Sequence, residues 1–172
     1  DGKPLGFMEA FVGGRSVGAH GVIAMLAMAH KNHGKLEWAK LFEPAIRIAE
    51  QGFPVSARLN RMVAVMKQLP NTAAPRALYF TASEPPEPLP AGSIIRNPEY
   101  AKTLRDIATN GPDAFYTGDI ARAIVKAVAA AKIPGGLSMA DLAAYRAIQR
   151  PAICGPYRTV FICGMRMPTS GG

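Results

Sequence analysis

Apolar residues recur at helical spacing through most of this chain. Between residues 21 and 33 they follow the i, i+3, i+4, i+7 pattern of one helix face, which consists of Val22, Met25, Leu26 and Ala29. Further apolar residues widen this face until it covers most of the circumference, which predicts a buried helix. Gly34 is the expected left-handed residue at the end of this helix.

The same reasoning predicts helices through residue 66, followed by an irregular stretch. Residues 36–51 should form two short helices or one kinked helix, because Pro44 removes a backbone donor. Ser56 is the expected N-cap of the next helix, whose core stripe would be Leu59, Met62, Val63 and Met66. Six prolines interrupt residues 70–96, where we expect a rigid connector with one or two helical turns at 73–80.

Helical signals resume at residue 97. Asn97 and Pro98 stand in the order of an N-cap and a first helical residue, and Gly111 follows the end of that helix. Its inner face should be formed by Tyr100, Leu104 and Ile107. A short helical turn is then predicted at 112–116.

Two more helices are predicted before residue 146. One runs from Gly118 to the glycine pair at 135–136, and its inner stripe consists of Ile120, Ala123, Ile124, Ala127 and Val128. Ser138 and Asp141 then match a capping box, which predicts a short helix that ends near Tyr145.

The periodicity changes to that of β-structure after Arg146. Two strands are expected about a turn at residues 155–156, and the second contains three consecutive apolar residues, Val160, Phe161 and Ile162. Such a run is typical of a strand buried on both faces. That burial requires further strands, which we expect to lie outside these residues. A short strand is also expected at 7–12.

These patterns indicate an α+β fold, predominantly helical with a C-terminal β-hairpin. We expect one partial domain over residues 1–172, helical at 20–145 and with strands at about 146–165. No apolar run reaches the roughly 18–20 residues of a membrane span. The first residues resemble neither a signal peptide nor a natural N-terminus, so we interpret the chain as a piece of a longer protein.

The net charge of +8 raises the possibility of an anionic partner. The basic residues, however, are mostly single and are divided evenly between the two halves of the chain. A solvated basic surface is therefore the favoured interpretation. The alternative is a stand-alone basic helical module that binds nucleic acid or another anionic polymer.

Two cysteines, Cys154 and Cys163, are too few for a disulfide framework or a zinc site. With the hairpin turn at 155–156, Cys154 would lie opposite Tyr157 and far from Cys163. The Cα spacing of about 4.4–6.8 Å that a disulfide needs would then not be met. We therefore expect two buried free thiols.

The chain contains several residues whose type suits binding or catalysis. The glycines around Gly13 fit neither common phosphate-loop spacing, so we predict a tight turn. His30 and His33 have no third ligand at suitable spacing and are predicted to be structural. Three arginines could bind a substrate carboxylate, but we predict that they are structural or lie on the surface: Arg15, Arg47 and Arg146. We assign no catalytic, substrate-binding, cofactor-binding or metal-binding residue.

Several short motifs occur in an order that resembles one known family. They are residues 29–38, 44–46, 49–53, 110–118, 136–145, 157–158 and 168–172. In this order they resemble an internal large-subunit segment of the γ-glutamyltransferases, also called glutathione hydrolases. Two local departures, at residues 19–21 and 165–170, affect turns and leave the subfamily and substrate open.

The resemblance implies an N-terminal-nucleophile hydrolase with an αββα sandwich, of which this chain would be a fragment. Such a precursor cleaves itself to expose a Thr nucleophile, whose α-amine acts as base. That Thr and the donor-binding arginine belong to motifs outside this chain, so we expect the chain alone to be inactive. No metal or organic cofactor is implied.

The resemblance also implies partners and a compartment. The partners would be the small subunit, or the remaining part of the same precursor, and γ-glutamyl compounds such as glutathione. By family analogy the protein would be periplasmic or secreted.

Overall fold

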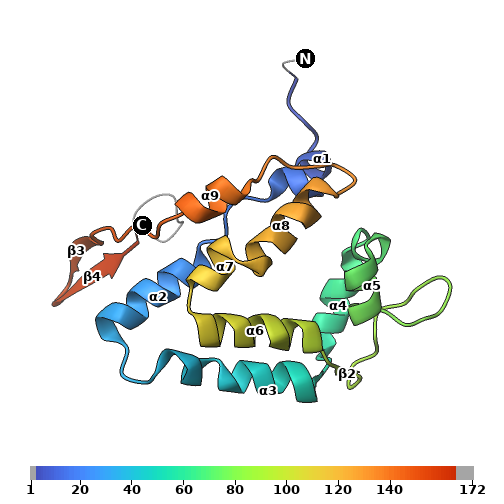
Figure 1. Cartoon of the computed structure of the whole chain (residues 1–172), viewed down its shortest axis with the longest axis horizontal. Helices are drawn as coiled ribbons and strands as arrows, with labels where there is room; N and C mark the ends of the chain where they lie inside the picture. Colours follow the sequence, from blue (N-terminus) through green and yellow to red (C-terminus); the bar gives the residue numbers. More distant parts are fainter. Residues whose placement is uncertain (1–2, 166–172) are drawn as a thin grey trace.

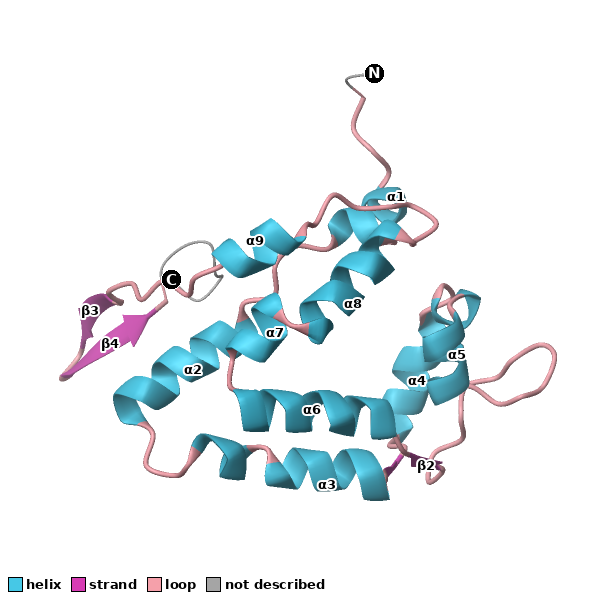
Figure 2. Cartoon of the chain, in the orientation of Figure 1, coloured by secondary structure: helices cyan, strands magenta, loops and turns pink. Residues whose placement is uncertain are grey.

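The computed structural model describes residues 3–165 and is dominated by helices (Figures 1 and 2). Within that range the α-helices are α1 (Phe7–Phe11), α2 (Val22–His33), α3 (Glu43–Gln51), α4 (Ala57–Val65), α5 (Ala73–Tyr79), α6 (Pro98–Asn110), α7 (Asp113–Thr117), α8 (Asp119–Ala129) and α9 (Met139–Ala144). Three short 3-10 helices connect them: η1 (Gly14–Ser16), η2 (Trp38–Leu41) and η3 (Leu69–Asn71). The prediction of a mainly helical α+β fold is confirmed.

The strands form two separate antiparallel pairs. In the first pair, β1 (Phe53–Pro54) lies against β2 (Ile94–Ile95), so the irregular stretch folds back onto the end of α3. In the second pair, β3 (Ile153–Tyr157) and β4 (Val160–Gly164) form the hairpin that follows α9 (Figure 1). The short β1–β2 pair was missed by the sequence patterns.

Helix α6 lies at the centre of the helical body. It packs along α3 on one side and meets α7 at its C-terminal end (Figure 1). Ala101, Leu104 and Ile107 of α6 are buried, as is Leu142 of α9, which is 0% exposed. The Trp38 ring nitrogen donates to the carbonyl of Ile107 at 3.0 Å, which attaches η2 to the same helix.

Three helices begin at the predicted caps. The Ser56 hydroxyl accepts from the Leu59 amide at 3.0 Å, and the Asn97 side chain accepts from the Tyr100 amide at 2.9 Å. At α9 the capping box is complete, because Ser138 and Asp141 each accept from the other's backbone amide. These hydrogen bonds satisfy donors that the first turn of a helix otherwise leaves without partners.

The glycine turn before α2 is confirmed and has a specific packing role. Gly13 adopts φ +114°, and the Gly14 amide donates to the carbonyl of Ile133 at 2.7 Å. A Cβ on Gly14 would lie 2.2 Å from the carbonyl oxygen of Val128. Only glycine therefore allows η1 to approach the end of α8 so closely.

Two local predictions near the N-terminus are wrong. Residues 7–11 form helix α1 and not a strand, because Phe7 and Phe11 stack one helical turn apart with ring centroids 5.6 Å from each other. Gly34 is extended, with φ −66° and ψ 139°, and not left-handed. Glycine is needed there because a Cβ would lie 2.3 Å from the His30 ring.

Several predicted inner faces are exposed in this chain. No residue of α2 is buried, and Val22 is 60% exposed. Tyr100 and Met62 are also exposed. On α8 the residues Ala121 and Val128 are buried, whereas most of the predicted stripe faces an open groove. The helix also ends at Ala129, several residues before the predicted glycine pair. Apolar periodicity thus predicts where each helix has an apolar face. It does not predict which of these faces are buried within residues 3–165.

The hairpin corrects two further predictions. Its turn lies at residues 158–159 and not at 155–156, so Cys154 pairs directly with Cys163. The two cysteines form a disulfide and are exposed, contrary to the expectation of buried free thiols. The predicted register differs from the observed one because a glycine and a proline, which usually mark turns, lie inside β3. Within residues 3–165 the second strand is exposed, with Phe161 at 75%, and its burial on both faces by strands outside this chain stays a prediction.

Candidate functional site

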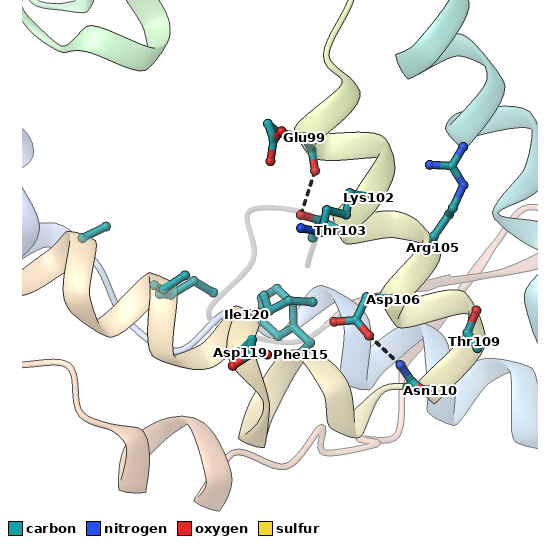
Figure 3. Close-up of a pocket in the computed structure, with 13 residues that line it drawn as sticks. Glu99, Lys102, Thr103, Arg105, Asp106, Thr109, Asn110, Phe115, Asp119 and Ile120 are labelled. Atoms are coloured by element: carbon teal, nitrogen blue, oxygen red, sulfur yellow. Dashed lines mark hydrogen bonds between the residues drawn. The ribbon is translucent and has the colours of Figure 1, made fainter.

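An open groove lies between α6 and α8 and has a volume of about 950 Å³ (Figure 3). Its α8 side is apolar and its α6 side is polar. The apolar lining comes from Phe115, Ile120, Ala123, Ile124 and Ala127. The polar lining comes from Glu99, Lys102, Thr103, Arg105, Asp106, Thr109 and Asn110, with Asp119 at the start of α8. Most of the predicted stripe of α8, together with Phe115 of α7, therefore forms the apolar wall of this groove.

Several polar side chains that line the groove already have partners within α6 or on α3. Thr103 donates to the carbonyl of Glu99 at 3.1 Å, and Asn110 donates to the Asp106 carboxylate at 2.6 Å (Figure 3). Arg105 turns toward α3 and forms an ion pair with Glu50. These contacts give an amphipathic surface suited to packing or binding, and none of them pairs a nucleophile with a base.

A second arrangement surrounds Tyr116 at the junction of α2, α7 and α9. The Tyr116 hydroxyl donates to the carbonyl of His20 at 2.7 Å and accepts from the Ala24 amide at 3.0 Å. The ring of Tyr145 stacks on Tyr116 with centroids 5.9 Å apart. Burial raises the pKa of Tyr116, partly offset by the hydrogen bond from Ala24. The hydroxyl is thus neutral near pH 7 and serves to join three helices.

A shallow hollow of about 270 Å³ opens beside this junction, between α2 and the segment after α9. Its lining residues are Ala24, Ala27, Met28, Pro112, Tyr116, Tyr145, Arg146 and Ala147. A Cβ on Gly21 would lie 2.2 Å from the Tyr145 hydroxyl, so the start of α2 passes directly against that ring. The hollow is mainly apolar, and the Tyr116 hydroxyl already has two partners, so we assign it no chemistry.

Neither His30 nor His33 lies in an arrangement that could bind a metal. The Nε2 atom of His30 lies 2.7 Å from the carbonyl oxygen of Leu36, and its ring meets Trp38 edge-on. His33 is exposed at the end of α2. Within residues 3–165, no three His, Cys, Asp or Glu side chains converge as a metal site would require.

The three arginines weighed as clamps are not brought together. Arg15 lies on η1 and Arg47 on α3, and both are exposed. Arg146 follows α9 and donates to the carbonyls of Ala143 and Tyr145, each at 2.7 Å. It therefore caps the C-terminal end of α9, where a cation is favourable.

The sequence patterns missed the two features that define these sites. The apolar stripe on α8 is predicted by the sequence as a core face, whereas most of it lines a groove. The role of Tyr116 is not predictable from the sequence, because a single aromatic residue gives no sign of a hydrogen bond to a helix 92 positions away. None of the helices within residues 3–165 combines the length and hydrophobicity needed to cross a bilayer.

Comparison with known proteins identifies the chain. The profile of the family described as Gamma-glutamyltranspeptidase matches residues 2–172. The chain belongs to this family. It is 38% identical over 160 residues to the glutathione hydrolase proenzyme of Arthroderma benhamiae, which covers 92% of this chain. It is 34% identical over 157 residues to the glutathione hydrolase proenzyme of Escherichia coli, which covers 90% of this chain.

Solved structures of the family share the fold. The γ-glutamyltranspeptidase of Helicobacter pylori superposes with a TM-score of 0.88 at 26% identity, over 96% of this chain and 47% of that one. The transpeptidase CapD of Bacillus anthracis gives a TM-score of 0.77 at 27% identity, over 90% of this chain and 51% of that one. The expected family and its N-terminal-nucleophile hydrolase fold are therefore confirmed.

The chain spans about a quarter of the length of its relatives, namely 27% of the Arthroderma protein and 26% of the Escherichia protein. These comparisons give no support to the alternative of a stand-alone nucleic-acid-binding module.

Proposed function

We propose that the complete protein is a γ-glutamyl transferase or hydrolase that acts on glutathione or other γ-glutamyl amides. Residues 1–172 would be a partial large-subunit domain of it. The observation that carries this proposal is the family match over residues 2–172, together with a TM-score of 0.88 to a γ-glutamyltranspeptidase. Because the chain spans about a quarter of its relatives, the activity is proposed for the complete protein and not for this chain.

The chemistry proposed is nucleophilic catalysis by a Thr at a newly formed N-terminus outside this chain. Its hydroxyl attacks the γ-glutamyl amide, and its own α-amine accepts the proton. The resulting γ-glutamyl-enzyme is resolved by water or by an acceptor amine. Two relatives carry the word proenzyme in their names, which supports a precursor that is cleaved before it acts.

The role proposed for residues 1–172 is to support the part of the protein that carries this Thr. The exposed apolar residues of α2 and the apolar wall of the α6–α8 groove offer surface for that packing. The rim side chains Thr103, Asp106 and Asn110 are already bonded within α6, which suits a structural surface. The chain alone is accordingly proposed to be inactive.

The test uses the product of the full reading frame. It should separate into two subunits on a denaturing gel and release the chromophore from a chromogenic γ-glutamyl donor. Replacing the Thr at the new N-terminus by Ala should abolish both cleavage and release. An uncleaved and inactive wild-type protein, or a variant with unchanged release, would contradict the proposal. Activity of residues 1–172 alone would contradict the supporting role.

We also propose that the protein works outside the cytoplasm, in the periplasm or in the medium. The Cys154–Cys163 disulfide supports this location, because such bonds persist in oxidising compartments. Cell fractionation with an antibody against the chain would test it, and recovery in the cytoplasmic fraction only would overturn it.

A further inference from the structure

Tyr145 is the residue at which the chain leaves the helical body. Helix α9 ends at Ala144, and Tyr145 is extended, with φ −62° and ψ 135°. The next residues, 146–152, contain neither helix nor strand and lead directly into β3. Figure 1 shows α9 between the other helices and the β3–β4 hairpin. The direction that the backbone takes at Tyr145 therefore sets where the hairpin begins.

Two surfaces of the helical body hold the Tyr145 ring. The ring stacks on Tyr116, with centroids 5.9 Å apart and an interplanar angle of 7°. Its hydroxyl end lies against the start of α2, because a Cβ on Gly21 would be 2.2 Å from the Tyr145 hydroxyl oxygen and 2.9 Å from Cζ. The two hydrogen bonds of the Tyr116 hydroxyl, to His20 and Ala24, lie on either side of this glycine. They therefore fix the two surfaces relative to each other.

The glycine at position 21 leaves room for this ring. Its backbone, with φ −92° and ψ −14°, is in the right-handed helical region, which residues with a Cβ also adopt. The backbone conformation of Gly21 therefore does not require glycine. A side chain at Gly21 would instead displace the Tyr145 ring from its stack on Tyr116.

The backbone around Tyr145 is fixed as well. The Tyr145 amide donates to the carbonyl of Leu142 at 3.1 Å, and Leu142 is fully buried. The guanidinium of Arg146 donates to the carbonyls of Ala143 and Tyr145, each at 2.7 Å. All these contacts join residues of this chain, so they do not depend on which of its surfaces the rest of the protein covers.

We propose that Tyr145 is a positioning residue. Held between Gly21 and Tyr116, it directs the chain from α9 into the β3–β4 hairpin and so orients these strands for cleavage of the precursor. The part that concerns cleavage rests on the proposed function. The αββα sandwich is built on strands, and β3–β4 is the longer of the two strand pairs within residues 3–165. Tyr145 acts in this role through the strands and not by contact with the reacting atoms.

The cleavage step shows why orientation matters. The Thr hydroxyl attacks the peptide carbonyl that precedes it, and an ester replaces the amide while the Thr nitrogen becomes an amine. Water then hydrolyses the ester to a carboxylate and returns the Thr hydroxyl. Such an attack needs its reacting atoms in a defined geometry, which a displacement of about 1 Å can disrupt.

The first test measures the contact between Gly21 and the ring, by hydrogen exchange of the full-length protein. Gly21→Ala should speed exchange of the amides of residues 24–26, at the start of α2, by about tenfold or more. The same substitution in a Tyr145→Ala background should change these rates by less than about twofold, because the ring that collides with the new Cβ is gone. Equal effects in the two backgrounds would overturn the proposal, since Gly21 would then serve only the start of α2.

Two further variants complete this test. Gly18→Ala, whose Cβ would meet nothing within 4 Å, is the matched control and should leave the rates at residues 24–26 unchanged. Tyr145→Phe keeps the ring on Tyr116 and should retain wild-type exchange at residues 142–148, whereas Tyr145→Ala should speed it by about tenfold or more. Wild-type rates in Tyr145→Ala would show that the ring does not anchor the chain.

The second test follows cleavage of the full-length precursor with time on a denaturing gel. Tyr145→Ala and Gly21→Ala should each slow cleavage by about tenfold or more under conditions where α6 exchanges as in wild type. Tyr145→Phe should cleave at the wild-type rate, a rescue that separates the ring from the hydroxyl. Gly21→Ala keeps every other side chain of the junction and provides the test if Tyr145→Ala folds poorly.

The outcomes separate this proposal from the proposed function. If wild type is cleaved and Tyr145→Ala is cleaved as fast, Tyr145 has no positioning role. If wild type is not cleaved at all, the proposed function fails, and the exchange rates decide by themselves whether Tyr145 anchors the chain.

Discussion

The hydroxyl of Tyr116 accepts a hydrogen bond from the amide of Ala24 at 3.0 Å, across 92 positions of sequence. Ala24 lies in the first turn of α2, and the residue before that helix, Gly21, has no side chain with which to cap it. Tyr116 thus supplies from α7 the acceptor that a local Ser, Thr or Asp would usually provide. The same hydroxyl donates to His20, so one side chain fixes both the approach to α2 and its start.

Replacing this hydroxyl should weaken the fold. Tyr116→Phe removes the acceptor for the Ala24 amide and the donor to the His20 carbonyl, both in a partly buried site. The free energy of unfolding should fall by about 1–3 kcal/mol in urea titrations. Tyr100→Phe at an exposed tyrosine is the control and should change it by less than about 0.5 kcal/mol. Equal values for the two variants would contradict the capping role.

The same tyrosine should make stability fall at alkaline pH. Burial raises the folded-state pKa of Tyr116 above its ordinary value of 10.0. As pH rises, the unfolded chain therefore loses the Tyr116 proton before the folded chain does. The contribution of this hydroxyl to the free energy of unfolding is complete below pH 10.0 and is lost as pH rises through the folded-state pKa. Urea midpoints measured between neutral and strongly alkaline pH should decline more steeply for wild type than for Tyr116→Phe. Parallel curves would show that the hydroxyl does not titrate with unfolding.

The carboxyl group of Asp141, in the first turn of α9, should make stability fall at acid pH. Hydrogen bonds from the side chain and then the amide of Ser138 hold the pKa of Asp141 below its ordinary value of 3.8. The contribution of Asp141 to the free energy of unfolding is present above pH 3.8 and is lost as pH falls through the lower folded-state pKa. Asp141→Asn should flatten this part of the acid unfolding curve, followed by circular dichroism. Ser138→Ala should flatten it too, and an unchanged slope in both variants would count against the capping box as the cause.

The contact between η1 and α8 should tolerate no side chain. Gly14→Ala would place a Cβ 2.2 Å from the Val128 carbonyl oxygen and 2.7 Å from the Gly135 amide nitrogen. The backbone must shift to relieve this overlap, at a cost of about 1–3 kcal/mol seen as a lower melting temperature. Gly18→Ala is the matched control, since its Cβ would meet nothing within 4 Å. If both variants have the melting temperature of the wild type, η1 does not lie this close to α8 in solution.

Truncating the most enclosed leucine should be costly. Leu142 is 0% exposed, so Leu142→Ala would leave a cavity among α7, α8 and α9 and lower the free energy of unfolding by about 2–5 kcal/mol. Leu36→Ala removes the same atoms from an exposed site and should have little effect. Chemical denaturation of the two variants checks the difference. A smaller loss at Leu142 than at Leu36 would mean that α9 is not part of the core.

Local signals in the sequence predicted local structure well. Ser56, Asn97 and Ser138 were identified as caps, and each makes the expected hydrogen bond. Pro44 divides the stretch after Gly34 into a 3-10 helix and α3, as expected from its missing donor. A cap or a proline acts within one helical turn, so its effect can be read from neighbouring residues alone.

Predictions that depended on distant partners were less successful. Cys154 and Cys163 are partners because the turn lies at Arg158, which no turn-forming residue type indicates. The apolar stripe of α8 shows that the helix has an apolar face, but only the position of α6 shows that this face borders a groove. Sequence periodicity therefore does not locate the candidate site, although it predicts a helix at every residue that lines the site.

The hydrogen bond from Gly14 to Ile133 also sets an order of events during synthesis. The amide that donates is made near the start of the chain, and the carbonyl that accepts is made about 120 residues later. At roughly 5–20 residues per second, the N-terminal turn waits on the order of 6–24 seconds for its partner. During that interval the Gly14 amide lacks the Ile133 carbonyl that accepts its hydrogen bond, and η1 lacks its contact with α8. A nascent chain stalled before residue 133 should therefore hold residues 14–16 without the backbone partner that fixes them in the finished fold.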